Sequence, residues 1–76
     1  MKEQAKMAIE EILKNAFSTF DQCSNLTLRK SLIQSYFDMA YGIASFITNY
    51  GGGFDEEMVD WWNEEINPQF LEIMKN

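Results

Sequence analysis

The sequence predicts an all-α fold, a small helical bundle made of an antiparallel hairpin of two long helices, a third acidic helix and a short C-terminal helix. Two long segments, 2–20 and 26–50, repeat apolar residues every three or four positions, which is the period of an amphipathic helix. The run Gly51–Gly53 then acts as a hinge at which the chain can reverse. At 76 residues there is room for one hydrophobic core, so residues 1–76 are expected to form a single all-α domain.

The first helix is expected over residues 2–20. Its apolar side chains form one stripe, which comprises Ala5, Ala8, Ile9, Ile12, Leu13, Ala16, Phe17 and Phe20. The opposite face carries charges of both signs, a pattern typical of a solvated helix surface. The polar turn 21–25 that follows is short, so the first two helices are expected to pack antiparallel with their apolar stripes facing each other.

The second helix, 26–50, carries two apolar stripes. The first stripe comprises Leu28, Leu32, Tyr36, Met39, Ile43, Phe46 and Tyr50. The second stripe comprises Ile33, Phe37, Ala40, Ala44 and Ile47. Together the stripes cover roughly half of the circumference, so this helix is expected to need partners on two sides.

The remaining face of the second helix is polar and carries Lys30, Gln34, Asp38, Ser45, Thr48 and Asn49. Tyr41 falls on this polar side and is expected to be partly exposed. Ser24, Asn25 or Thr27 can cap the start of the helix, and Gly51 can cap its end. Gly42, Ser31 and Ser35 form a row of small residues, which favours either a solvated face or the close approach of another helix.

A third helix is expected over residues 55–67, with Asp55 as its N-cap. It should end near Asn67, because Pro68 disfavours helical geometry in the residue before it, and a short final helix should follow over 68–75. Met58, Val59, Trp62 and Ile66 share the apolar side of the third helix, and the short final helix carries Phe70, Leu71 and Met74.

The net charge of −6 comes entirely from the C-terminal third of the chain. Residues 1–54 hold five basic and five acidic side chains, whereas residues 55–76 hold seven acidic side chains and only Lys75. An acidic surface repels phosphate and anionic lipid, so direct binding to nucleic acid or to a membrane surface is disfavoured and a basic partner is favoured. One cysteine, no secretory leader and no apolar run of membrane-spanning length indicate a soluble cytoplasmic protein.

The candidate partner-binding site is the acidic face of the third helix together with the tryptophan at its edge. It comprises Glu56, Glu57, Asp60, Trp61, Glu64 and Glu65. A large aromatic side chain beside carboxylates is typical of an interface anchor. The alternatives are a solvated acidic face that keeps the protein soluble and a Trp61 that covers one end of the core. Carboxylates four residues apart can also share a divalent cation.

Catalysis has little support in these residues. The chain has no histidine, and Cys23 lies in a polar turn without a neighbouring base, so the usual pairs of nucleophile and base are missing. No clustered His and Cys ligands accompany the carboxylates. The protein is therefore expected to be no enzyme and to hold no cofactor or metal.

The leading hypothesis is a small acidic cytoplasmic module that binds a basic protein surface. One form of it is an inhibitor that mimics nucleic acid and occupies the groove of a nucleic-acid-binding protein. In general character the chain is similar to small acidic helical proteins of phages and mobile elements, a likeness of composition alone. The alternatives are a structural module that forms a homodimer through the apolar excess of the second helix, and a regulator that binds a small ligand between its aromatic-rich helices.

Overall fold

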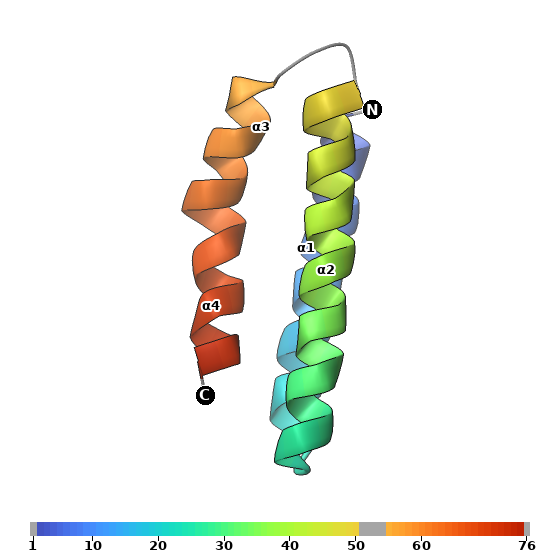
Figure 1. Cartoon of the computed structure of the whole chain (residues 1–76), viewed down its shortest axis with the longest axis vertical. Coiled ribbons are helices and arrows are strands. Elements are labelled where there is room, and N and C mark those ends of the chain that lie inside the picture. The colour runs from blue at the N-terminus through green and yellow to red at the C-terminus, as the bar shows by residue number, and fades with distance from the viewer. Residues whose placement is uncertain (1, 51–54, 76) are drawn as a thin grey trace.

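The computed structural model describes residues 2–50 and 55–75 and confirms an all-α bundle. Its elements are α1 (Lys2–Gln22), α2 (Leu26–Tyr50), α3 (Glu56–Trp61), η1 (Trp62–Ile66) and α4 (Asn67–Lys75). The first two helices form an antiparallel hairpin, and α3, η1 and α4 run back along it as one continuous helical segment (Figure 1). The predicted hinge at Gly51–Gly53 lies outside the described residues, as does the side chain of Tyr50.

The turn between α1 and α2 is fixed by caps on both helices. The side chain of Asn25 accepts a hydrogen bond from the backbone amide of Leu28 at 2.9 Å, so Asn25 is the N-cap among the three predicted candidates. Arg29 reaches back to the end of α1, where it donates to the carbonyl of Phe20 at 3.4 Å and lies 4.5 Å from the centre of its ring. The orphan groups at both helix ends are thereby partly satisfied.

The core lies between the hairpin and the C-terminal segment. It comprises Ala5, Ile9, Leu13, Ala16, Ile33, Ala40, Ala44, Ile47, Met58, Trp62, Ile66, Phe70 and Ile73. The predicted stripe of α1 supplies four of these residues, and the second stripe of α2 supplies four more, with Phe37 packed against them. Small side chains such as Ala16 and Ala40, both fully buried, let the helix backbones approach closely.

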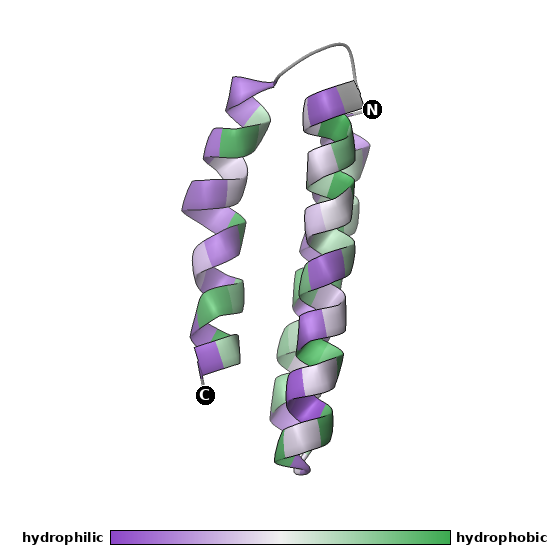
Figure 2. Cartoon of the chain, in the orientation of Figure 1, coloured by the Kyte–Doolittle hydropathy of each residue, from purple (hydrophilic) through white to green (hydrophobic). Residues whose placement is uncertain are grey.

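The first stripe of α2 is only partly covered, although α2 has helical partners on two sides as expected. Tyr36 and Ile43 pack against the core, and the other described members of the stripe are exposed. Leu28, Met39 and Phe46 are 51%, 55% and 57% exposed, and Leu32 is 37% exposed. The physical reason is geometric, since α1 and the C-terminal segment pack on the other stripe and leave this side of α2 open. Hydrophobic residues therefore recur along all of α2 in Figure 2, although only part of them are buried.

One further side chain differs from the sequence-based expectation. Thr48, assigned to the polar face of α2, is buried at 9% exposure, because the C-terminal helical segment packs on that side. In the final helix, Phe70 and Ile73 are buried, whereas Leu71 is 53% exposed. Tyr41 is 54% exposed, as the sequence predicts.

The helix does not break at Pro68, contrary to the prediction. Asn67 keeps helical backbone angles, and its amide donates to the carbonyl of Trp62, five residues earlier. This π-helical turn takes up one extra residue just before the proline, which has no amide of its own to donate. The side chain of Gln69 donates to the carbonyl of Glu65 and so satisfies one acceptor near the proline.

The π-helical turn also keeps the core residues of this segment in phase. Met58, Trp62, Ile66 and Phe70 are all buried and follow one another at intervals of four. In an ideal α-helix a spacing of four advances the stripe by about 40° at each step, or about 120° over the whole set. The wider turn at η1 cancels part of this drift, so all four side chains face the hairpin.

An aromatic cluster joins α2 to the C-terminal segment. Phe37 lies 5.9 Å from Trp62 and 5.4 Å from Phe70, measured between ring centres, and Trp62 lies 6.4 Å from Phe70. Tyr41 adds an edge contact to Trp62 at 5.8 Å. Such pairs contribute roughly 0.5 to 1.5 kcal/mol beyond the burial of their area, so this cluster is a main anchor of α4.

Candidate functional site: the acidic surface of the C-terminal segment

The start of α3 is held against α1 by lysines. Asp55 caps the helix, accepting a hydrogen bond from the amide of Met58 at 3.0 Å, as predicted. The ammonium group of Lys2 lies 3.4 Å from the Asp55 carboxylate and 3.3 Å from that of Glu57. Lys6 lies 3.7 Å from Glu57. These contacts raise the pKa of Lys2, with the hydrogen bond to Glu57 as the largest cause.

Three of the six predicted site residues face α1. Glu57, Trp61 and Glu65 follow at intervals of four and form the inner row of the segment. Trp61 is half-buried against the core, and the ammonium of Lys6 lies 5.2 Å from the centre of its ring. Trp61 therefore covers one edge of the core, which is the alternative role that the sequence left open.

A groove of about 460 Å³ runs along the inner row between α1 and the C-terminal segment. Its lining joins Trp61 and Glu65 to side chains of α1 that the sequence did not place in the site, and comprises Glu10, Leu13, Lys14, Phe17, Trp61, Glu65, Ile66 and Gln69. An apolar floor between two carboxylates suits the aliphatic stem and charged end of a basic side chain. Only the packing of α1 against η1 brings Glu10 here, so sequence spacing could not reveal it.

The other predicted carboxylates form the outer row, which comprises Glu56, Asp60 and Glu64. All three are exposed, and no basic side chain within residues 2–50 and 55–75 lies within ion-pair distance of any of them. Their spacing of four brings like charges close together, which costs the helix a few tenths of a kcal/mol per pair. The structure thus divides the predicted site into an inner row, where lysines of α1 approach Glu57 and Trp61, and an outer row that is open to solvent.

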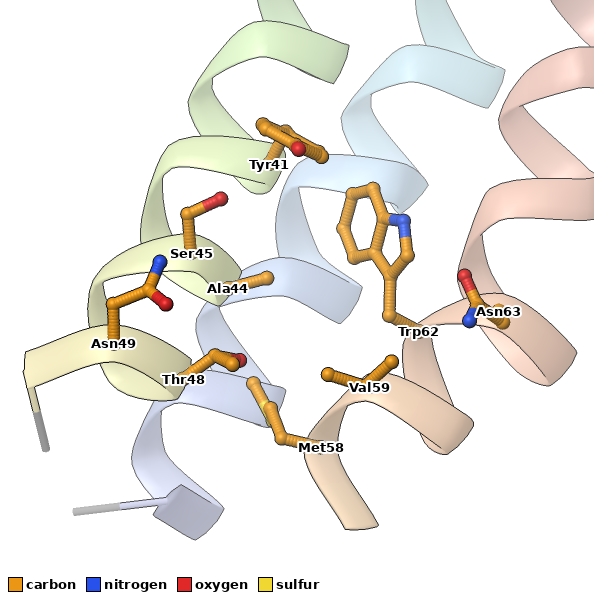
Figure 3. Close-up of a pocket in the computed structure, with 9 residues that line it drawn as sticks. All are labelled: Tyr41, Ala44, Ser45, Thr48, Asn49, Met58, Val59, Trp62 and Asn63. Carbon is orange, nitrogen blue, oxygen red and sulfur yellow. The ribbon is translucent and has the colours of Figure 1, made fainter. Parts of the chain in front are cut away.

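A second cleft separates α2 from α3 and η1. Its floor is apolar, with Ala44, Met58, Val59 and Trp62, and its rim is polar (Figure 3). The rim residues are Tyr41, Ser45, Thr48, Asn49 and Asn63. At about 240 Å³ this cleft is smaller than the roughly 300 to 1,000 Å³ typical of sites for metabolites and drug-sized molecules. This cleft between the aromatic-rich helices is therefore small for the ligand that the alternative hypothesis requires.

The described residues show neither a metal cluster nor a membrane-spanning helix. In residues 2–50 and 55–75 no three side chains of His, Cys, Asp or Glu gather closely enough to hold a metal ion. No helix of this described part is both long enough and apolar enough to cross a bilayer.

Comparison with known proteins finds no relative of this chain. No protein-family model, no curated protein and no solved structure matches it. The role of the acidic surface is therefore argued from its chemistry and geometry.

Acidification should weaken the cap of α3. The pKa of the Asp55 carboxyl lies below its ordinary value of 3.8, chiefly because the amide of Met58 donates to it. A carboxyl whose pKa is lower in the folded chain than in the unfolded chain stabilises the fold at pH values above its pKa in the unfolded chain. That contribution is lost as the pH falls through its pKa in the folded chain. The melting temperature should therefore drop more steeply below pH 3.8 in the wild type than in Asp55→Asn, which keeps a capping side chain but does not titrate. Thermal melts followed by circular dichroism across this pH range measure the melting temperatures of both proteins. An equal dependence of melting temperature on pH in the two proteins would contradict the prediction.

Proposed function

We propose that this protein is a binding module whose outer row, Glu56, Asp60 and Glu64, engages a basic surface of a partner protein. The observation that carries the proposal is the division of the acidic segment. The lysines of α1 approach Glu57 and leave the outer row without a cation in the described chain. Because this carboxylate row stays solvated and lies on a rigid helical segment, a basic partner can bind it without first breaking an internal ion pair.

The inner row adds a second element to the same surface. Trp61 and the flanking carboxylates Glu10 and Glu65 border the groove beside α1. A basic side chain from the partner that enters this groove would meet the apolar surface of Trp61 and two carboxylates, in competition with Lys14, which also lines the groove. The proposal thus assigns charge steering to the outer row and anchoring to the groove.

The finer form of the proposal is that the partner is a nucleic-acid-binding protein and that the acidic segment competes with nucleic acid. Its support is the alignment of the outer row along one helix face. At four residues per charge the row carries one charge per about 6 Å of helix axis. One DNA strand carries one negative charge per about 3.4 Å of its helix axis. The row therefore offers about half that linear charge density, which suits a short basic patch better than a long groove.

An affinity experiment tests the proposal. The chain is immobilised through a tag, and proteins are captured from a cell extract at about 50 mM salt and eluted at about 500 mM. We expect the retained proteins to carry basic surface patches and to leave as salt rises, because the contacts are between exposed charges. Nucleic acid added during capture should displace those retained proteins that bind nucleic acid. Partners that are acidic, or that stay bound at high salt, would contradict the proposal.

A further inference from the structure

The exposed side of α2 forms a continuous seam with a seven-residue repeat. Its positions alternate steps of four and three and comprise Leu28, Leu32, Ser35, Met39, Gly42, Phe46 and Asn49. All seven residues are exposed. This spacing is that of the contact positions in a coiled coil, in which side chains of one helix insert between those of another. The spacing of the seam therefore favours the packing of another helix along it.

The seam alternates large and small side chains. From Leu32 onward, large residues occupy one position of each repeat, at Leu32, Met39 and Phe46, and small or short polar residues occupy the other, at Ser35, Gly42 and Asn49. A shallow depression over Gly42 is bordered by Met39, Ile43 and Phe46. A Cβ atom added at Gly42 would meet nothing within 4 Å, so packing within the chain does not require glycine there.

We propose that this seam is the interface of a homodimer in which α2 packs antiparallel against α2 of a second copy. When two such helices run in opposite directions, each large position faces a small position of the other copy. Met39 then inserts over Gly42 of the second copy, and Phe46 packs over its Ser35. In a parallel pair large residues would face large ones and small residues small ones, which leaves voids at Gly42 and Ser35.

The polar groups of the seam are compatible with burial. No seam position carries a charge, so two chains of net charge −6 can meet here without placing like charges in contact. The hydroxyl of Ser35 already donates to the carbonyl of Ser31 at 3.1 Å and needs no new partner. Asp38, beside the seam, accepts a hydrogen bond from Gln34 at 3.0 Å. This neutral surface gives a basic partner nothing to bind, so a second copy suits it better.

The area available sets the strength of the dimer. A large side chain offers on the order of 200 Å². In this register Leu32, Met39 and Phe46, each roughly half exposed, contribute about 300 Å² per copy. Even with the flanking Tyr36 and Ile43, two copies bury less than the roughly 1,200 Å² at the lower end of stable specific interfaces, which is the size range of weak complexes. We therefore expect an equilibrium between monomer and dimer that shifts with concentration.

Sedimentation equilibrium over a range of concentrations tests the interface. The wild type should dimerise, and Met39→Lys and Gly42→Lys should each weaken association at least about tenfold. Both substitutions reduce the net negative charge, so weaker association cannot come from a larger overall charge. Gly42→Lys should also raise the melting temperature of the monomer, because lysine is a better helix former than glycine. Ser18→Lys, an exposed position of α1 with the same charge change, should dimerise like the wild type.

Spin labels test the orientation. In a Cys23→Ser background, labels on Ser35→Cys should lie about 16 Å apart along the helix axis, because residue 35 of one copy pairs with residue 46 of the other. A parallel pair would bring them into contact and overturn the antiparallel arrangement. A chain that stays monomeric up to about 1 mM, or a dimer that both lysine variants leave intact, would overturn the seam itself.

Discussion

Phe70→Ala is expected to lower the free energy of unfolding by about 3 to 5 kcal/mol. Phe70 is fully buried and contacts both Phe37 and Trp62, so its removal opens a cavity where α4 meets the hairpin. Truncation of a buried phenylalanine costs about 3 to 5 kcal/mol. A 76-residue domain of ordinary stability has roughly 4 to 11 kcal/mol in all. One substitution therefore removes a large part of the folding free energy.

Urea titration followed by circular dichroism measures this loss. The matched control is Leu71→Ala, one residue along the same helix but 53% exposed, which should change the unfolding free energy by less than about 0.5 kcal/mol. We expect the helical signal of the whole chain to be lost together in Phe70→Ala, because the hairpin shares its core with α4. Equal stabilities of the two variants would show that α4 does not anchor the bundle.

Reversal of the outer row should strongly weaken partner binding at low salt. In the triple variant Glu56→Lys/Asp60→Lys/Glu64→Lys, each attractive contact with a basic partner becomes a repulsive one. Three reversed charges should weaken binding on the order of 100-fold at low salt, with a smaller effect as salt rises. Titration calorimetry with a partner obtained by capture measures the change.

A second triple variant controls for net charge. Glu3→Lys/Glu11→Lys/Asp21→Lys changes the total charge by the same amount but places it on exposed positions of α1 outside the groove. It should bind far better than the outer-row variant. Equal losses in both variants would show that net charge, and not the outer row, drives binding. Both variants should remain dimeric at the concentrations that dimerise the wild type, because the acidic segment and the α2 seam are separate surfaces.

The helices themselves could be predicted from the sequence because local signals agree along the chain. The apolar period of α1 identifies Ile9 and Leu13 as core residues, and both are buried. Caps gave the helix starts, since Asn25 and Asp55 each accept a hydrogen bond from a backbone amide three residues on. Such signals depend on neighbours within one helical turn, so they can be recognised in the sequence without knowledge of the tertiary structure.

The candidate site could be predicted only in part. Sequence spacing placed six residues on the third helix, but which carboxylates stay free depends on where Lys2 and Lys6 arrive from α1. The makeup of the site also depends on the half-burial of Trp61 against the core, and this burial follows from the packing of two helices. The groove that joins Trp61 to Glu10 involves residues about fifty positions apart, so no local pattern contains it.

The sequence alone determined that this is an all-α chain with its negative charge gathered after residue 54, because helical period, capping residues and composition are local properties. The tertiary structure decided which stripe of α2 is buried, since both stripes are apolar and the choice follows from α1 and the C-terminal segment packing onto the stripe that holds the small residues Ala40 and Ala44. It also decided that the helix continues through Pro68, because burying Phe70 and Ile66 on one face requires the wider turn at η1.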